Sequence, residues 1–455
     1  MAAKQGPRGV LNAMPPGSPR SPLWQTYRFA TAPTSFLDEL HEGYGDIFVL
    51  RLAGNRPWVC LSSPADLRAM YAADPHVLQS GRAAGGVFAP LTGWNASLTL
   101  DGAEHQRRRR MLLPYFSASR VGAFAASTHR IACEAIAAWS RGRPFALHPC
   151  LQIISLDVIM RAILGVEPKT DRRLAGLIKR LGEIGMSSPF LFIPALQWDF
   201  GRFSPWGRIV HLARSTRAAL LRELERRRAA EMSGRDDTLS FLLRQRDADG
   251  SGLDDEQICD ELIALLIAGY ETTHIAMCWV FERLLAYPDA REQVRRELAG
   301  LRDIAEIGRL PYLDAVVRES LRVRPVSPIC GGRLVTAPFA IAGYRLPPGV
   351  ILTNCSYLLH RRKDVYFDAD RFRPNRFLES PPAAHELTTF GGGNRQCIGN
   401  PLALLEIKVV VAAVLDALDL KPCDAAVGAV GRGVHLVPRD GLRVVAVDRS
   451  AESSG

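Results

Sequence analysis

The chain has 455 residues, of which 47% are hydrophobic, and carries a formal net charge of +10 at pH 7. This length and apolar content are ample for a large core, and no Pro/Ser-rich linker or charge block divides the interior. Nine scattered cysteines without a close Cys-x-x-Cys pair argue against a disulfide framework or a zinc site and favour a reducing, cytoplasmic location. We expect one domain over residues 34–447, after a Pro/Gly-rich and partly mobile segment, 1–33, and before a short tail, 448–455.

Two further classes of protein are disfavoured. No stretch approaches the roughly 18 to 20 apolar residues of a membrane span, and the N-terminus lacks the charged-then-apolar form of a signal peptide. The run from Arg107 to Arg110 invites a nucleic-acid interpretation, but basic residues elsewhere are dispersed and no basic surface interleaved with aromatic residues is evident. We therefore expect neither a transmembrane anchor nor a nucleic-acid partner.

Apolar periodicity and turn residues predict a mainly α fold with small β-sheets. Helices are predicted over 35–42, 64–73, 121–138, 151–164, 173–186, 209–230, 254–286 and 310–322. Strands are predicted as a hairpin over 46–52 and 57–61, as a pair over 333–344 and 346–352, and as a C-terminal hairpin over 434–447. The Gly/Ala-rich residues 80–97 are predicted to be irregular, and the connector 187–198 is strongly apolar, which is unusual for a loop.

The long helix predicted over 254–286 has an unusual centre. Ala268 and Gly269 are followed by the acid Glu271 and the alcohol Thr272, although glycine costs about 1 kcal/mol relative to alanine inside a helix. A threonine hydroxyl that replaces a backbone hydrogen bond can open a helix and admit a water. The alternative is a buried glutamate that is held by its own helix.

The stretch from Phe390 to Gly399 holds one cysteine, Cys397, in a setting built mostly of glycine. The apolar helix that begins near Pro401 would direct its first amides at the sulfur and stabilise a thiolate. Arg395 adds a fixed cation that suits a carboxylate. A thiolate beside an arginine suggests a metal cofactor with acidic arms, and haem fits, although an ordinary buried cysteine on a Gly-rich loop is the alternative.

This stretch, read as Phe-x-x-Gly-x-Arg-x-Cys-x-Gly, resembles the haem-binding signature of the cytochromes P450, and every fixed position is present. Four further elements resemble the same family over roughly residues 34–447. They are His-x-x-x-Arg at His105 and Arg109, Ala-Gly-x-Glu-Thr at 268–272, Glu-x-x-Arg at Glu319 and Arg322, and Pro-x-Arg-Phe around Arg376.

The resemblance implies a triangular helical prism in which haem b lies between the long helix and the Cys397 loop. The segments 80–97 and 187–198 correspond to the family's pocket loop and access lid. The implied iron ligand is Cys397, and the implied haem-propionate ligands are His105, Arg109, Arg333 and Arg395. The other implied haem neighbours are Phe390, Gly391, Gly399, Ala268 and Gly269. The implied proton donors are Glu271 and Thr272, and the implied structural network is Glu319, Arg322 and Arg376.

The function that this resemblance implies is a bacterial monooxygenase that activates O2 with two electrons from a separate ferredoxin or flavodoxin and its reductase. The basic net charge would then suit an acidic electron-transfer protein. We expect a monomer without a fused reductase. The substrate would be a hydrophobic fatty acid, terpenoid or steroid, or polyketide that is hydroxylated or epoxidised. The pocket residues that can be named are Ala264, Ala268, Val326, Ile329 and Val434. A peroxygenase that uses hydrogen peroxide is one alternative, although the Glu271–Thr272 pair favours O2, and a non-catalytic haem binder or sensor is another.

Overall fold

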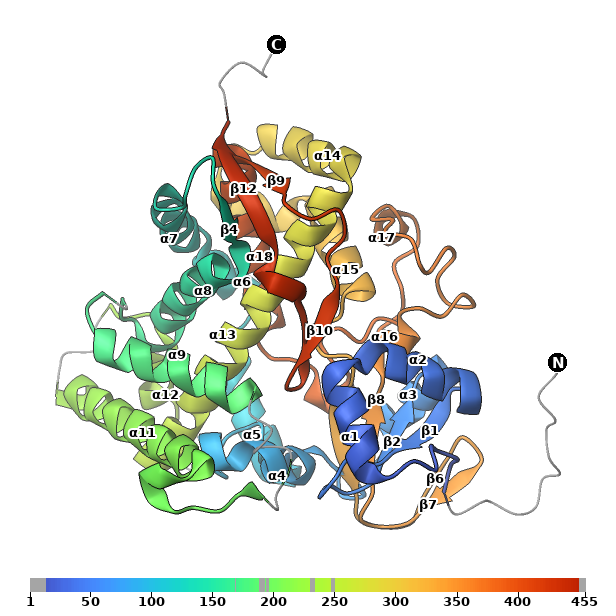
Figure 1. The fold of residues 1–455 in the computed structure, drawn as a ribbon. Coiled ribbons are helices and arrows are strands. Elements are labelled where there is room, and N and C mark those ends of the chain that lie inside the picture. Colours follow the sequence, from blue (N-terminus) through green and yellow to red (C-terminus); the bar gives the residue numbers. More distant parts are fainter. Residues whose placement is uncertain are drawn as a thin grey trace.

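The computed structural model describes residues 14–167, 169–187, 193, 196–229, 234–246 and 250–449. They form a mainly helical body with small sheets that lie at the lower right, near the centre and at the top of Figure 1, so the predicted fold class is confirmed. The helices are α1 (Pro22–Thr31), α2 (Pro33–Tyr44), α3 (Pro64–Ala72), α4 (Ser80–Thr92), α5 (Gly102–Leu112), α6 (Ala118–Gly122), α7 (Ala125–Ala137), α8 (Leu147–Leu164), α9 (Arg172–Ser187), α11 (Pro205–Ala229), α12 (Thr238–Arg244), α13 (Asp255–Ala286), α14 (Pro288–Ala299), α15 (Pro311–Val323), α16 (Ser356–Leu359), α17 (Arg376–Glu379) and α18 (Asn400–Ala417).

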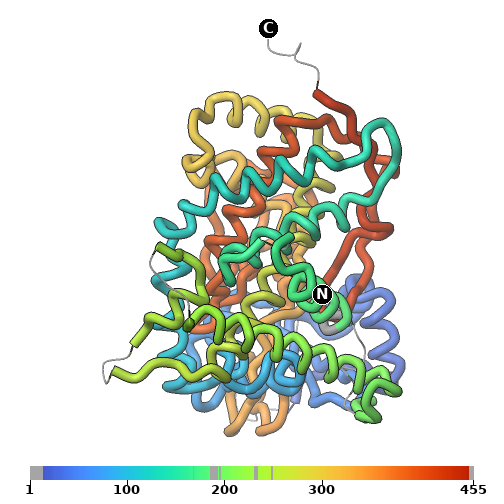
Figure 2. Tube along the Cα trace, turned by 90° about the vertical axis from the view of Figure 1, so that its left-hand side faces the viewer, coloured from blue at the N-terminus to red at the C-terminus, as the bar shows by residue number. Residues whose placement is uncertain are grey.

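Helix α13 is the central element, and it runs through the middle of the molecule in Figure 1. A capping box fixes its start, because the Asp254 carboxylate accepts from the Gln257 amide at 2.8 Å while the Asp254 amide donates to the Gln257 side chain at 3.2 Å. It packs against α8, α9, α11, α15 and α18. Figure 2 views the molecule from the side on which α7, α9 and α11 lie, with these segments in front of the yellow and orange ones.

The strands form four small sheets. They are β1 (Ile47–Leu50), β2 (Trp58–Leu61), β3 (Leu78–Gln79), β4 (Pro144–Ala146), β5 (Cys330–Val335), β6 (Phe339–Ile341), β7 (Tyr344–Leu346), β8 (Ile351–Asn354), β9 (Leu418–Pro422), β10 (Ala429–Arg432), β11 (His435–Pro438) and β12 (Arg443–Asp448). The largest sheet has the order β1-β2-β8-β5-β3, and in it β2 pairs in parallel with β8, so that Trp58 lies opposite Ile351. Early and late parts of the chain are therefore joined in one sheet.

Two predictions about local structure were wrong, and one element was not predicted. Residues 80–92, expected to be irregular, form α4, which tolerates Pro90 near its end. The expected C-terminal hairpin does not form, because β11 pairs with β10 whereas β12 pairs with β4 and β9 in another sheet. Part of the N-terminal segment, residues 22–31, is the helix α1, whose N-cap is Ser21.

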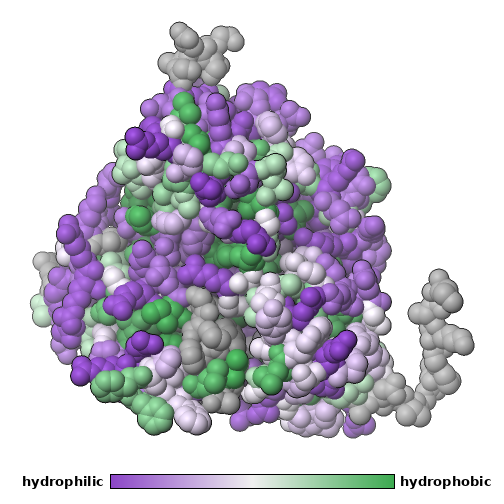
Figure 3. All heavy atoms as spheres, in the orientation of Figure 1, coloured by the Kyte–Doolittle hydropathy of each residue, from purple (hydrophilic) through white to green (hydrophobic). Residues whose placement is uncertain are grey.

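The expectation that no stretch reaches the length of a membrane span was also wrong. By length and composition alone, helices α8 and α13 are long and apolar enough to cross a membrane. Most of each apolar window is buried among neighbouring elements, as is usual for core helices, and the face in Figure 3 is mostly hydrophilic with apolar patches toward its lower half.

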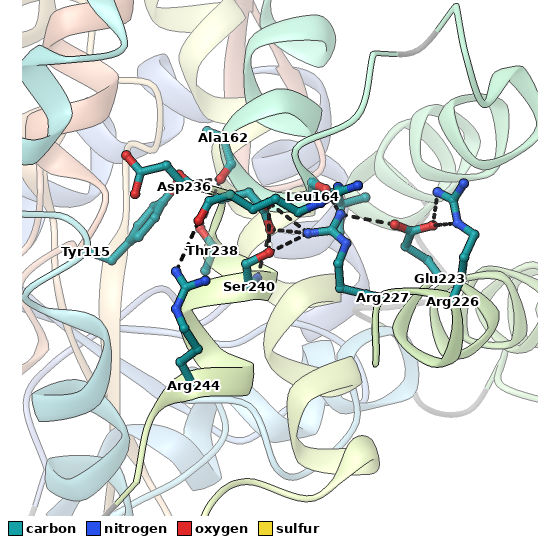
Figure 4. A network of polar contacts seen from close by, with 12 residues as sticks. Tyr115, Ala162, Leu164, Glu223, Arg226, Arg227, Asp236, Thr238, Ser240 and Arg244 are labelled. Atoms are coloured by element: carbon teal, nitrogen blue, oxygen red, sulfur yellow. Dashed lines mark hydrogen bonds and ion pairs between the residues drawn. The ribbon is translucent and has the colours of Figure 1, made fainter. Parts of the chain in front are cut away.

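A buried arginine joins three helices beside α13 (Figure 4). Arg227 on α11 donates to both carboxylate oxygens of Asp237 at 2.9 and 2.8 Å and to the Leu164 carbonyl, at the end of α8, at 2.6 Å. It also donates to Ser240 on α12 at 2.6 Å and to Glu223 at 3.1 Å. Because several acceptors satisfy one buried cation, α8, α11 and α12 are held together at a single point.

Candidate functional site

The loop from Phe390 to Gly399 lies directly before α18. Gly391 and Gly393 have φ values of 70° and 65°, a left-handed conformation that glycine adopts without strain. The Cys397 amide donates to the Phe390 carbonyl at 2.9 Å, which closes the loop. A Cβ atom at Gly392 would lie 2.4 Å from the Tyr71 ring, so the loop also needs glycine there to pack against that ring.

The groups around the Cys397 sulfur favour its thiolate form, which is the form that binds a metal. Burial raises the pKa of its thiol, while the amides of Gly399 and Asn400 at the start of α18, and the cation of Arg109, act to lower it. Cys397 as a whole residue is nevertheless exposed to solvent, so the protein around its thiol does not enclose the residue completely. This arrangement presents a sulfur whose thiolate form is supported by amide dipoles and a cation.

Four basic side chains come together near this sulfur. Burial and, in decreasing order of influence, the cations Arg395, Arg109 and Arg333 together lower the pKa of His105 to about 4. Burial also lowers the pKa of Arg395 to about 10, with Arg333 and Arg109 again contributing. These four residues are the ones that the resemblance implied as propionate ligands, and they lie within electrostatic range of one another.

One carboxylate, Asp101, faces this basic cluster among the described contacts. It accepts from Arg395 at 2.5 Å, and Arg395 also donates to the carbonyls of Ser97 at 3.2 Å and Leu100 at 2.6 Å. Arg333 is buried and stacks over the Tyr71 ring at 5.5 Å, and its Nε atom has no hydrogen-bond partner. The cluster thus holds more cations than carboxylates, and one buried donor, Arg333 Nε, is unsatisfied. A ligand that carries carboxylates would suit both features. Together with the sulfur, this donor set fits haem.

Ala268, Gly269 and Thr272 lie at the centre of α13, and each has a different set of neighbours. Ala268 is exposed although it lies in mid-helix beside buried neighbours. The Thr272 hydroxyl donates to the Ala268 carbonyl at 2.6 Å, and α13 continues unbroken through this point. The hydroxyl therefore shares the Ala268 carbonyl within a continuous helix. A Cβ atom at Gly269 would lie 2.5 Å from Cδ1 of Ile159, so this glycine permits the close packing of α8 on α13.

Glu271 faces a different neighbour from Thr272. Its side chain is only 2% exposed and its Oε1 atom has no hydrogen-bond partner. Burial raises its pKa to about 7, Arg432 on β10 acts to lower it, and Glu183 on α9 acts to raise it. A Cβ atom at Gly182 would lie 3.1 Å from Oε1, which places this carboxyl against α9. The acid and the alcohol therefore have separate partners.

The five expected pocket residues differ in burial and in the apolar clusters that they contact. The Leu436 amide on β11 donates to the Val326 carbonyl at 2.7 Å, and both Val326 and Val434 pack against the main core. Ile329 instead belongs to a separate apolar cluster with Phe36 and Phe48. Ala264 is buried and Ala268 is exposed.

Glu319, Arg322 and Arg376 form a buried network. Arg322 donates to the two oxygens of Glu319 at 2.7 and 2.9 Å, and Arg376 donates to Glu319 at 3.0 Å. Arg322 also donates to the carbonyls of His360 and Ala369 at 2.5 and 2.8 Å. The network thus ties α15 and α17 to the segment that precedes the Cys397 loop.

Sequence reasoning missed three residues beside the site. Asp101 and Tyr71 contact the arginine cluster, and Arg108 is buried against Glu261 at 3.1 Å rather than facing solvent. Asp101 opens the same run that holds His105 and the arginines, and a lone carboxylate there was a usable signal. Nothing local in the sequence marked Tyr71.

Comparisons with known proteins agree with this geometry. The family described as Cytochrome P450 matches residues 15–427. The chain is 32% identical to cytochrome P450 135B1 of Mycobacterium tuberculosis over 408 residues, which are 90% of this chain and 85% of that protein. It is 30% identical to cytochrome P450 138 of the same species over 434 residues, which are 95% of this chain and 96% of that protein.

Two solved structures share the fold. A retinoic acid-bound cyanobacterial CYP120A1 superimposes with a TM-score of 0.84 at 24% identity and covers 97% of this chain and 100% of its own. The haem domain of cytochrome P450DA superimposes with a TM-score of 0.84 at 21% identity and covers 97% of this chain and 99% of its own.

Proposed function

The chain belongs to the cytochrome P450 family as a bacterial haem-thiolate monooxygenase that binds haem b, and from this premise we propose that it oxidises hydrophobic small molecules with electrons from a ferredoxin or flavodoxin and its reductase. One observation carries the assignment of its site. The Cys397 sulfur, supported by two amides, lies near four basic side chains that are faced by one carboxylate.

We assign Cys397 as the iron ligand and His105, Arg109, Arg333 and Arg395 as the residues that hold the propionates. The unsatisfied Arg333 Nε supports this assignment, since a buried donor without a partner is costly and a carboxylate would satisfy it. Phe390, Gly391, Gly399 and Ala268 would contact the macrocycle. For Gly269 we propose helix packing instead, because Ile159 occupies the space beside it.

When bound, the haem supplies the activation of O2 and the transfer of one oxygen atom to a C–H bond or a double bond. The other oxygen atom leaves as water, which requires two electrons and two protons. Thr272 can orient its hydroxyl from the Ala268 carbonyl. Glu271, with a pKa of about 7, can both hold and release a proton near neutral pH.

Three features support a hydrophobic substrate and an acidic redox partner. The proposed pocket residues Ala264, Ala268, Val326 and Val434 are apolar. One of the similar structures holds retinoic acid, an apolar chain with a carboxylate. The net charge of +10 favours encounter with an acidic electron carrier. The scattered cysteines support a cytoplasmic location.

The ligand assignment is tested by the absorption spectrum of the reduced, CO-bound protein. We expect the strongly red-shifted Soret band of a thiolate-ligated haem in the native chain and its loss in Cys397→Ser. Cys423→Ser, at an exposed cysteine elsewhere, should retain the band. A band that persists in Cys397→Ser would refute the assignment.

The substrate class is tested with a panel of fatty acids, terpenoids, steroids and polyketides. Binders should shift the haem spin state and be oxidised only with O2, reductase and electron carrier. Turnover that is faster with hydrogen peroxide alone would favour a peroxygenase instead. A panel without any spin shift would contradict the proposed class.

A further inference from the structure

Glu183 on α9 has a partly exposed side chain at the boundary between solvent and the protein interior. Its side chain is 31% exposed and lies 3.9 Å from the Lys179 ammonium. The buried Gln152 on α8 donates from Nε2 to Glu183 Oε1 at 3.0 Å. Because Gln152 is buried, this hydrogen bond directs the Oε1 atom of Glu183 toward the interior. The exposed part of the same carboxyl group can exchange protons with water.

Helix α9 touches α13 at the residue next to Glu183. A Cβ atom at Gly182 would lie 2.9 and 3.0 Å from the Tyr270 ring and 3.1 Å from Glu271 Oε1. A side chain there would collide with both, so glycine is what allows the two helices to approach so closely. Glu183 is therefore one residue along the chain from the contact with Tyr270 and Glu271.

The Tyr270 hydroxyl is a buried polar group that has no hydrogen-bond partner in the part of the chain that the structure describes. The Tyr270 ring and Glu271 Oε1 both lie against Gly182. Burial raises the pKa of the Tyr270 hydroxyl, and the negative charges of Glu271 and Glu183 act to raise it further. Gln152 is near enough to act in the opposite direction, although the two side chains do not meet with hydrogen-bond geometry. A hydroxyl can accept one proton while it donates another.

The charged groups that face Glu271 come from two elements. Glu183 approaches from α9 and Arg432 from β10, whereas α8 contributes the uncharged Gln152. Burial is the largest influence, and the pKa of Glu271 near 7 means that both of its protonation states are accessible in the folded protein.

We propose that Glu183 is the solvent-side proton donor to Glu271, with the Tyr270 hydroxyl as the relay between the two carboxyls and Gln152 as the residue that positions Glu183. This inference rests on the proposed role of Glu271. After Glu271 gives its proton to the reaction, its carboxylate takes the hydroxyl proton of Tyr270. The hydroxyl oxygen takes the proton of Glu183 in the same event, and water reprotonates Glu183. No electron moves in these steps, and the net change is one proton carried from solvent to the site.

The test compares Glu183→Gln and Tyr270→Phe with Lys179→Gln, a control that changes charge on the same helix face and leaves both carboxyls in place. In both test variants we expect the fraction of electrons lost to hydrogen peroxide to rise at least about twofold and the solvent isotope effect on turnover to grow. Lys179→Gln should match the native enzyme. Native coupling and a native isotope effect in both test variants would overturn the proposal.

A second measurement does not depend on turnover. The infrared carbonyl band of protonated Glu271, identified by its absence in Glu271→Gln, can be titrated in the resting enzyme. Glu183→Gln should lower the pH at which Glu271 ionises, because it removes a negative charge, whereas Tyr270→Phe should leave it unchanged. An unmoved titration in Glu183→Gln would refute the proximity of the two carboxyls.

The variant Glu271→Gln distinguishes a failure of the proposed proton route from a failure of the proposed function. If it uncouples turnover while Glu183→Gln and Tyr270→Phe do not, protons arrive by another route and the proposed function stands. If Glu271→Gln itself couples like the native enzyme, the role of Glu271 and the route both fail. If Glu183→Gln does not load haem, Tyr270→Phe decides, since it leaves both carboxyl groups in place and should still uncouple turnover.

Discussion

Glu406 is a buried acid on α18 that no cation neutralises among its described contacts. Its Oε1 atom has no hydrogen-bond partner among the described residues, and burial raises its pKa to about 8, with a hydrogen bond from Ser155 on α8 acting in the opposite direction. The folded protein therefore holds this carboxyl protonated at neutral pH.

We predict that Glu406→Gln makes stability less dependent on pH. Because the folded-state pKa lies above the ordinary value near 4.5, Glu406 favours folding at low pH, and this contribution is lost as the pH rises through about 8. The variant should unfold at a higher temperature above pH 8, by an amount equivalent to a few kcal/mol at most, and nearly like the native chain at pH 5. Thermal unfolding midpoints between pH 5 and 9 provide the measurement, and a constant difference across that range would contradict the prediction.

Arg333 leads to a prediction about cofactor retention. Replacing it with Met keeps the buried volume but removes the unsatisfied donor that we assign to a propionate. The loss of one charge-assisted hydrogen bond, roughly 1.5–3 kcal/mol, should speed haem transfer to an apoprotein acceptor by about tenfold or more. Arg345→Met, at an exposed arginine on β7, is the control and should not change that rate. Equal rates in the two variants would remove Arg333 from the site.

Residues with a fixed spacing in a motif could be predicted from the sequence, whereas their partners could not. The pattern around Cys397 and the spacing of His105 and Arg109 led to positions that the fold brings near one another. Glu183 approaches the centre of α13 from α9, and Tyr71 contacts Arg333 and the Cys397 loop from α3, and no local pattern records such long-range contacts. Gly269 has a packing role that is visible only once Ile159 is in place.

At the scale of elements, the junction of α8, α11 and α12 depends on Arg227. Its side chain is 1% exposed, whereas its neighbour Arg226, which also donates to Glu223, is 67% exposed. The two arginines are adjacent in sequence and share an acceptor, so they form a matched pair for measuring what burial contributes.

We predict that Arg227→Met lowers the free energy of unfolding by roughly 3–5 kcal/mol, because Asp237 would remain buried without its cation, although Glu223 would keep Arg226. Arg226→Met should cost at most about 1 kcal/mol, since an exposed ion pair contributes little. Thermal unfolding of both variants measures the contrast, and hydrogen exchange should increase first in α12. Similar losses in the two variants would show that burial does not decide the contribution.

Long apolar-periodic helices were predicted within a few residues, and the elements that failed were those defined by distant partners. The acidic start and apolar length of α13 are local signals. In contrast, β11 and β12 adjoin in sequence but pair with β10 and with β4 and β9, a choice that depends on packing far along the chain. The glycines of residues 80–92 suggested a loop, yet tertiary contacts hold that segment as α4.

At the scale of the whole molecule, the net charge of +10 gives a prediction about electron transfer. If an acidic ferredoxin is the donor, long-range attraction speeds encounter at low salt and is screened within about 8–10 Å at 0.1–0.15 M ionic strength. The bimolecular rate of reduction should fall steadily as salt rises, while the rate with a small neutral reductant should not. Stopped-flow measurements with both donors test this, and a salt-independent rate with the acidic donor would argue against charge-guided docking.

The five-stranded sheet has a consequence for the order in which the protein can be completed during synthesis. The β1–β2 hairpin leaves the ribosome hundreds of residues before β8, its parallel partner, exists. At about 5–20 residues per second, the β2 edge remains without its neighbour for on the order of tens of seconds. An unpaired strand edge is a template for association with other chains. The growing chain should therefore depend on chaperones during that interval, and slower elongation should lengthen the exposure rather than assist folding.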